Sequence, residues 1–186
     1  MSLSMDDDFP DPGQIAARLS RPRRPVPETS STLSPAAVLL PFHWPDGRPH
    51  LILIERSRIV STHKGQMAFP GGRREPGDAS LLITALRETR EELGCSLQGF
   101  SILGALPPQP TTSTGFLVHP FVAAMADLPR FAPDPREVAS WVSIPWAFFR
   151  HNPSFSPQPA FTYRKYWIWG ATAAIIQRVI VLLHAP

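Results

Sequence analysis

The sequence has few of the features that mark secreted proteins. Its 186 residues include a single cysteine, Cys95, which cannot form a disulfide within the chain. A buried structural role is expected for this thiol, and a reducing, cytoplasmic compartment for the protein. Near the N-terminus, residues 6–8 are all aspartate, where a secretory signal would need a basic and then an apolar run. Export is therefore not expected.

Long apolar runs and lysine-rich runs are also missing. The most apolar stretch, residues 167–183, is too short for a membrane span and contains Gln177 and Arg178. It predicts an amphipathic helix packed on a sheet, and no membrane association is expected. The formal net charge is only +3, without a cluster of lysines. Nucleic acid is therefore not an expected partner, whereas a small anionic substrate is.

The composition is that of a folded chain. Hydrophobic residues make up 43% of the sequence and charged residues 18%, which excludes a disordered protein. Residues 1–30 are expected to be an N-terminal extension, with a short helix over residues 14–19 and a proline- and arginine-rich linker. That linker is either a solvated spacer or an arm that contacts phosphate. Residues 31–186 are then expected to form one domain.

The apolar pattern of the main domain predicts strands and helices in mixed order. Strands are expected over residues 36–42 and 51–55, joined as a hairpin by a turn at 45–48, and again over 67–69, 100–106, 116–124 and 141–145. Pro120 indicates that the strand over 116–124 is at an edge or carries a bulge. A short helix should begin at Trp146, and a longer one should span 171–183. This order predicts an α/β or α+β sandwich, with a mixed sheet between helices.

The central feature is the stretch of residues 65–94. Gly71 and Gly72 predict a tight turn that would allow the backbone to approach a phosphate closely. A helix with one apolar stripe follows, formed by Leu81, Leu82, Ala85, Leu86 and Leu93. Asp78 is the candidate N-cap of this helix, and Gly94 is the candidate residue for its C-terminal turn. The segment therefore predicts a loop, a helix and a second loop.

Three carboxylates share one flank of this helix. Glu88, Glu91 and Glu92 follow a spacing of i, i+3 and i+4, so their like charges repel unless a cation lies among them. Mg²⁺ and Mn²⁺ prefer such oxygen ligands. Arg87 lies one turn before Glu91 and could pair with it. A solvated helix face is the alternative interpretation, but the preceding glycine pair favours a phosphate and metal site.

These residues carry a family resemblance. Gly72-x5-Asp78 followed by Arg87-Glu88-Thr89-x-Glu91-Glu92-x-Gly94 resembles the Nudix box of hydrolases that cleave nucleoside diphosphates linked to another group. The usual pattern has Glu in place of Asp78 and one residue fewer before the Arg-Glu pair. The resemblance implies a Nudix-type mixed sheet between helices and diphosphate hydrolysis with Mg²⁺ or Mn²⁺ held by Glu88, Glu91 and Glu92.

Two flanking segments resemble the coenzyme A pyrophosphatase-like branch of this family. They are Arg56-Ser57-x5-His63-x-Gly65-Gln66-Met67-Ala68-Phe69-Pro70-Gly71-Gly72 and Thr114-Gly115-Phe116-x-Val118-x-Pro120. The implied products from coenzyme A are 3′,5′-ADP and 4′-phosphopantetheine. This branch usually has Arg where the chain has Ser61, which keeps ADP-ribose, dinucleotides and nucleoside triphosphates as alternative substrates. A non-catalytic module that senses a nucleotide is the alternative of another class.

The resemblance also implies roles for individual residues. Arg87 would orient the carboxylates, Arg56 would neutralise phosphate, and Gly71 and Gly72 would shape the backbone beside the metal. Glu91 and Glu137 are both candidates for the general base. For Glu137 the alternative is a surface residue paired with Arg136.

Some other assignments remain open at this point. His63 either contacts phosphate or stabilises a turn. Aromatic side chains near residues 163–169 either stack on a base or pack in the core. Small hydrolases of this fold often pair, so a homodimer is possible.

Overall fold

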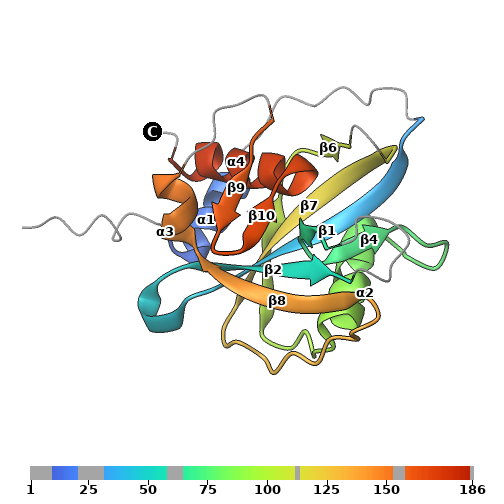
Figure 1. Cartoon of the computed structure of the whole chain (residues 1–186), viewed down its shortest axis with the longest axis horizontal. Helices are drawn as coiled ribbons and strands as arrows, with labels where there is room; N and C mark the ends of the chain where they lie inside the picture. Colours follow the sequence, from blue (N-terminus) through green and yellow to red (C-terminus); the bar gives the residue numbers. More distant parts are fainter. Residues whose placement is uncertain (1–9, 21–31, 58–64, 112–113, 153–157, 185–186) are drawn as a thin grey trace, which may run out of the picture.

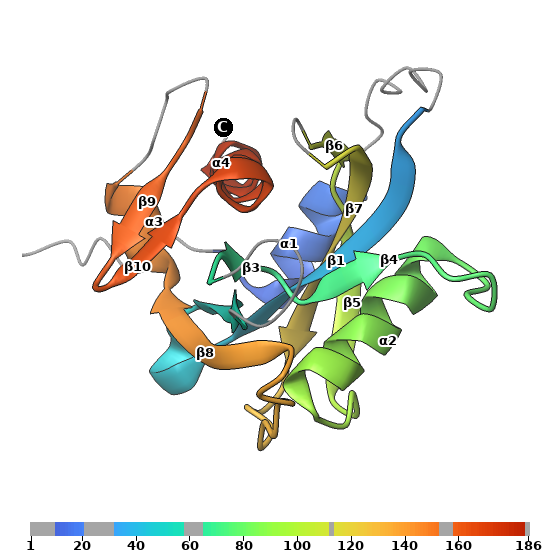
Figure 2. The same cartoon turned by 45° about the vertical axis from the view of Figure 1, so that its right-hand side comes forward.

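The protein is a three-layer sandwich, as the order of elements in its sequence predicts (Figure 1). The computed structural model describes residues 10–20, 32–57, 65–111, 114–152 and 158–184. A mixed β-sheet forms the middle layer. Helix α2 (Leu81–Leu93) covers one face of the sheet, and helices α1 (Pro12–Leu19) and α4 (Gly170–His184) lie on the other (Figure 2).

The sheet has the order β3–β2–β1–β7–β5, with three further strands attached to it. Its long central strands, β1 and β7, run parallel in register from Ser34↔Phe116 to Phe42↔Ala124, whereas the other pairings are antiparallel. The strands are β1 (Ser34–His43), β2 (His50–Arg56), β3 (Met67–Ala68), β4 (Gly71–Arg73), β5 (Phe100–Ala105), β6 (Gln109–Pro110), β7 (Phe116–Met125) and β8 (Val138–Pro145). One parallel pair among antiparallel pairs makes this a mixed sheet.

The predicted hairpin is confirmed. Strands β1 and β2 are joined by a short 3₁₀ turn at Pro45–Gly47. Asp46 and Gly47 both have positive φ, 52° and 74°, which suits an Asp-Gly pair in a tight connection. The turn returns β2 antiparallel to β1 and carries its end, at Arg56, toward α2.

Helix α2 (Leu81–Leu93) is the predicted central helix. Ala85 and Leu93 are buried, and Leu81 and Leu86 pack against the cluster that contains Ala85. Gly94 ends the helix in the left-handed conformation, at φ 59°, as expected. The prediction that Asp78 is the N-cap is wrong. Ser80 caps the helix by accepting a hydrogen bond from Ile83 N, because Asp78 is engaged elsewhere.

Pro120 indicated either an edge strand or a bulge, and the edge alternative is wrong. Strand β7 lies between β1 on one side and β5 and β6 on the other. Pro120 falls where the pairing passes from β5 to β6, and its carbonyl accepts a hydrogen bond from Leu106 N. The irregularity lies in β5, where the register shifts between Ile102 and Gly104. A missing N–H is tolerated at such a gap.

The remaining elements contribute buried side chains to the main core, on the second face of the sheet. They are α1 (Pro12–Leu19), α3 (Trp146–His151), the hairpin of β9 (Phe161–Tyr163) and β10 (Tyr166–Ile168), and α4 (Gly170–His184). The short helices expected near residues 14–19 and at Trp146 and the long helix expected over 171–183 are thus confirmed. Within the described residues, no helix is long and apolar enough to cross a membrane.

Candidate active site

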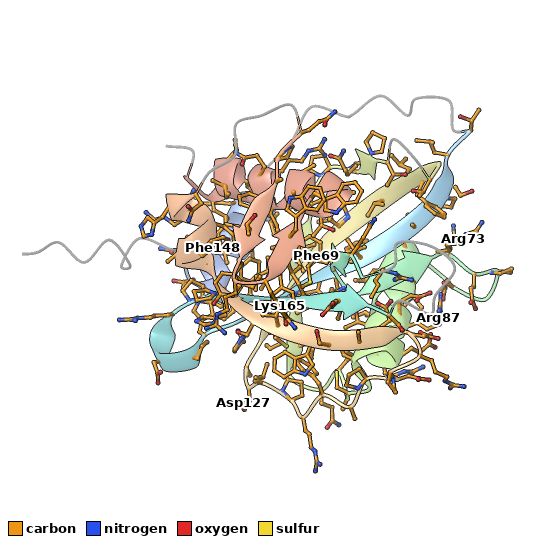
Figure 3. The ribbon with its side chains drawn as sticks, in the orientation of Figure 1. Phe69, Arg73, Arg87, Asp127, Phe148 and Lys165 are labelled. Carbon is orange, nitrogen blue, oxygen red and sulfur yellow. The ribbon has the colours of Figure 1, made fainter. Side chains whose placement is uncertain are left out.

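Arg87 is the centre of a polar cluster at the contact between α2 and β4 (Figure 3). Its Nε and Nη2 donate to the two carboxylate oxygens of Asp78 at 3.1 and 3.0 Å. Its Nη1 donates to Glu88 at 2.9 Å and to Glu91 at 3.2 Å, and Nη2 also reaches the carbonyl of Arg73 at 3.2 Å. The predicted pairing of Arg87 with Glu91 is confirmed, and the guanidinium is the cation that lies among the like charges.

Asp78 holds the Arg87 guanidinium in place through two hydrogen bonds. The carboxylate is buried and also accepts hydrogen bonds from Glu75 N and Thr84 Oγ1, both at 2.9 Å. The hydrogen bonds from Arg87, first of all, hold the pKa of Asp78 well below its usual value. Asp78 therefore stays ionised, and its bidentate pairing fixes the plane of the Arg87 guanidinium.

Glu92 is the buried carboxylate of the three. Only 3% of the residue is exposed, and its oxygens accept from Arg56 Nη1 at 3.1 Å and from Gly71 N at 2.9 Å. Burial raises the pKa of Glu92 to about 7, and the charges of Glu88 and Glu137 act in the same direction. The hydrogen bond from Gly71 and the charge of Arg56 oppose this shift. Glu92 is thus a carboxylate whose charge needs a further cation nearby.

The glycine pair lies in a strand, so the prediction of a tight turn is wrong. Gly71 and Gly72 begin β4 and pair with Val38 and Ala37 of β1. Gly71 has φ 150°, and a Cβ there would lie 2.3 Å from the carbonyl oxygen of Ala37. A Cβ on Gly72 would lie 2.5 Å from the carboxyl carbon of Glu88. The glycines therefore let β4 approach both β1 and the carboxylates, a close approach that other residues would prevent.

Glu137 lies just before β8, with an exposed side chain. Its carbonyl accepts a hydrogen bond from Ser57 N at 2.8 Å, which places it beside the end of β2. Its charge acts on Glu92. Glu137 is thus a surface residue, as the alternative has it, but Arg136 forms its ion pair with Asp134, at 2.6 Å. The charge of Glu137 is only a smaller cause of the raised pKa of Arg136. The role of Glu137 as a base stays a prediction.

The carboxylates do not form a ready metal cage. Within the described ranges, no group of three or more His, Cys, Asp or Glu side chains is arranged to hold an ion, because arginines occupy the space among the glutamates. Glu88 and Glu91 each contact Arg87 through a single oxygen. The donor set of three carboxylates, one buried with a raised pKa, nevertheless suits a hard divalent cation.

Two predicted features lie outside the described residues: Ser61, where the resembling branch has Arg, and His63. Cys95 is a free, buried cysteine, and burial raises the pKa of its thiol, so the prediction of a buried structural residue is confirmed. Tyr163 and Tyr166 pack against the core, whereas Trp169 is 40% exposed.

Reasoning from the sequence missed the anchoring role of Asp78 and the support from Thr84. The signal was present in the spacing, because Asp78 occupies the position where the Nudix box usually has Glu. Capping preferences favoured an aspartate before a helix and led to the wrong role. Neither spacing nor periodicity indicates that Thr84, inside the helix, donates to Asp78.

Comparisons with known proteins identify the family of this chain. The model of the NUDIX domain family matches residues 33–161. An uncharacterized Nudix hydrolase, NudL, from Pectobacterium atrosepticum is 37% identical over 155 residues, which cover 77% of this chain and 80% of the relative. Identity at that level over most of both chains shows common family membership.

Solved structures share the fold at lower identity. A Caenorhabditis elegans Ap4A hydrolase in a binary complex has a TM-score of 0.52 and 19% identity, over 62% of this chain and 82% of that one. The NUDIX domain of Shewanella oneidensis NrtR complexed with ADP ribose has a TM-score of 0.51 and 19% identity, over 67% and 80%. The family match, the relative and the fold lead to one conclusion: this chain belongs to the Nudix hydrolases and is a pyrophosphatase of that family.

Proposed function

We propose that the enzyme cleaves the diphosphate bond of a nucleoside diphosphate linked to another moiety, with coenzyme A or its derivatives as the first candidate substrate. The observation that carries this proposal is the buried Glu92, held between Arg56 and Gly71 N beside the Arg87 cluster. Two arginines and three carboxylates lie together there, beside a glycine backbone that approaches them closely. Diphosphate hydrolysis needs such a combination of charge neutralisation and positioning.

The chain's own residues divide the work. Arg56 would neutralise phosphate charge while it holds Glu92, since its side chain is 25% exposed at the end of β2. Arg87, fixed by Asp78, would keep Glu88 and Glu91 in place. Gly71 and Gly72 would keep the backbone close to the substrate. Glu91, half-exposed on α2, and the exposed Glu137 remain the two candidates to accept the proton from the attacking water.

We propose Glu88, Glu91 and Glu92 as the metal-binding residues, with Mg²⁺ or Mn²⁺ as the ion. When bound, the ion would neutralise the diphosphate and lower the pKa of water that attacks phosphorus. The raised pKa of Glu92 supports this assignment, because a nearby divalent cation favours the carboxylate form that burial disfavours.

Two other proposals keep the same site and change the ligand. One is a pyrophosphatase for ADP-ribose, for dinucleotides or for nucleoside triphosphates. It is supported by the ADP ribose bound to the NrtR domain and by the Ap4A hydrolase among proteins of the same fold. The other, a nucleotide sensor without catalysis, is disfavoured because Glu88, Glu91 and Glu92 are all present. We further propose that the enzyme works in the cytoplasm, which suits its single, unpaired cysteine.

The test is one panel of substrates with product masses. The full chain is incubated with coenzyme A, acetyl-coenzyme A, ADP-ribose, NADH and Ap4A, each with Mg²⁺, with Mn²⁺ or with a chelator. We expect metal-dependent release of 3′,5′-ADP and 4′-phosphopantetheine from coenzyme A. Preferential cleavage of ADP-ribose or Ap4A would show that this compound, and not coenzyme A, is the substrate. Binding without any product would favour the sensor.

A further inference from the structure

A hollow lies beside the end of β2, and none of the three glutamates of α2 lines it. It has a volume of about 470 Å³, within the range of small-molecule sites, and its walls come from the end of β2, from β3 with the residues before it, and from the β9–β10 hairpin. The segment before and within β3 contributes Gly65, Gln66 and Met67, and the β9–β10 hairpin and its exit contribute Lys165, Trp167 and Trp169. Figure 3 shows Lys165 at the turn of that hairpin.

The hollow presents a platform of exposed indole rings. Trp167 and Trp169 are 59% and 40% exposed, and their rings stack with centroids 5.4 Å apart and planes 21° from parallel. Leaving two large aromatic rings in water forgoes the free energy of burying them, so such a pair on the wall of a pocket indicates a ligand with a flat face.

This hollow is joined to the catalytic residues through Arg56. The backbone of Arg56 accepts from Gly65 N and donates to Gln66 O, both at 3.0 Å, so the residue forms part of the pocket's frame. Its guanidinium bonds Glu92 at 3.1 Å. Glu55, in the wall of the hollow, and Arg56, which bonds Glu92, are neighbours in β2 whose side chains leave the strand on opposite faces. A substrate that reaches both places must therefore pass the end of β2.

The charged side chains in the hollow limit the kind of ligand that it can bind. Glu55 lies in the wall, and its carboxylate accepts from Ser140 Oγ at 2.8 Å. A carboxylate disfavours a phosphate at that place and favours a ligand that donates hydrogen bonds. Lys165 Nζ lies over the Tyr166 ring, 5.1 Å from its centroid, and adds a cation to the wall.

We propose that the Trp167–Trp169 platform binds the base of the substrate's nucleotide half, a flat, amino-bearing purine such as adenine. This inference rests on the proposed function for the direction in which the diphosphate lies. It goes beyond that function in naming which end of the substrate enters the hollow and which residues recognise it. The pantetheine or sugar end would then extend to the other side of the carboxylates.

The experiment separates base binding from hydrolysis. Calorimetry without metal measures binding of AMP and of 4′-phosphopantetheine to the wild type, to Trp167→Ala and Trp169→Ala, and to the matched Trp→Phe variants. Loss of one base–indole stack is worth about 1–3 kcal/mol, so each alanine variant should weaken AMP binding roughly 5- to 150-fold. The phenylalanine variants should recover most of it, and phosphopantetheine binding should stay within about twofold.

An exposed apolar control, Leu128→Ala, should change neither affinity. The inference is overturned if the wild type does not bind AMP, if the tryptophan variants bind it as the wild type does, or if they weaken only phosphopantetheine. With a substrate from the panel, KM should rise in the tryptophan variants while kcat stays within about twofold. If no diphosphate is hydrolysed but AMP binding still depends on both rings, the proposed function fails and the base site stands.

Discussion

At the scale of single residues, Arg87 connects the most groups in the site. It bonds Asp78 with two nitrogens and Glu88 and Glu91 with a third. Arg87→Lys keeps the charge but loses the planar fork, so a lysine cannot hold all three carboxylates together. We expect kcat/KM to fall by about 10- to 100-fold and the metal concentration for half-maximal rate to rise.

Arg90→Lys is the matched control for this variant. Arg90 is exposed, three residues further along α2, and its substitution should leave the rate within about twofold. Equal rates for Arg87→Lys and Arg90→Lys in steady-state assays would show that the Arg87 cluster is structural only.

The sequence predicted much of this site at the same scale. Spacing along a helix places Glu88, Glu91 and Glu92 on one flank and Arg87 one turn from Glu91, because the geometry of a helix is fixed by the backbone. The partners of Arg56 and Asp78 could not be found in this way. Arg56 meets Glu92 across 36 positions of sequence, and only the tertiary fold brings the end of β2 to α2.

At the scale of elements, the end of α2 depends on Gly94. Its φ of 59° is easy only for glycine, and a Cβ would lie 2.0 Å from the carbonyl oxygen of Ala132. Gly94→Ala should therefore lower the free energy of unfolding by about 2 kcal/mol or more, because strain and a backbone clash add. Urea unfolding measures this. Gly77→Ala is the control, since nothing lies within 4 Å of the added Cβ.

Strands β1, β2 and β8 are linked by two histidines that share one hydroxyl group. His43 Nε2 and His50 Nδ1 each lie 2.8 Å from Ser143 Oγ. Burial, with a smaller effect from His50, lowers the pKa of His43 to about 4 from 6.5. Between these two pKa values the unfolded chain binds more protons than the folded one. The contribution of His43 to the free energy of unfolding is therefore fully present above pH 6.5 and is lost as the pH falls toward 4.

The size of this effect is testable by unfolding at several pH values. The shift at His43 is worth about 3 kcal/mol by pH 4, at 1.36 kcal/mol per pKa unit. His43→Gln cannot take up the proton, so its free energy of unfolding should change less between pH 6.5 and pH 4. A variant with the pH dependence of the wild type would contradict the assignment.

The positions of the strands and helices could be predicted from the sequence, but which strands pair in the sheet could not. Alternation and turn residues identify β1, β2 and the final helix. Pro120 shows the limit: proline in a strand favours an edge, yet β7 is central because a gap between β5 and β6 accommodates the missing donor. Gly71-Gly72 shows it again, since a pair typical of turns serves here for close strand packing.

At the scale of the whole molecule, the N-terminal helix α1 is part of the packed structure. Ile15 and Leu19 are 1% and 8% exposed and belong to the main core, and Arg18 Nη1 donates to the carbonyls of Leu182 and Leu183 at the end of α4. The division of the chain at residue 30 stays a prediction. Because the family match begins at residue 33, it does not indicate how much α1 contributes.

Truncation of Ile15 measures that contribution. Ile15→Ala should lower the free energy of unfolding by about 2–4 kcal/mol, the cost of a large buried side chain, whereas the exposed Ala17→Ser should cost about 0.5 kcal/mol. An unchanged urea midpoint for Ile15→Ala would mean that residues 10–20 are a dispensable extension. Light scattering on the same samples would test the predicted homodimer.

The central claim is that the carboxylates of α2 carry out a metal-dependent cleavage of diphosphate. The most direct measurement is the Mg²⁺-dependent rate of Glu92→Gln, with the preferred substrate of the panel, beside the exposed control Asp127→Asn. We predict that Glu92→Gln folds, loses at least about 100-fold in kcat and needs more Mg²⁺, while Asp127→Asn equals the wild type. A Glu92→Gln enzyme with unchanged turnover at the same Mg²⁺ concentration would contradict the claim.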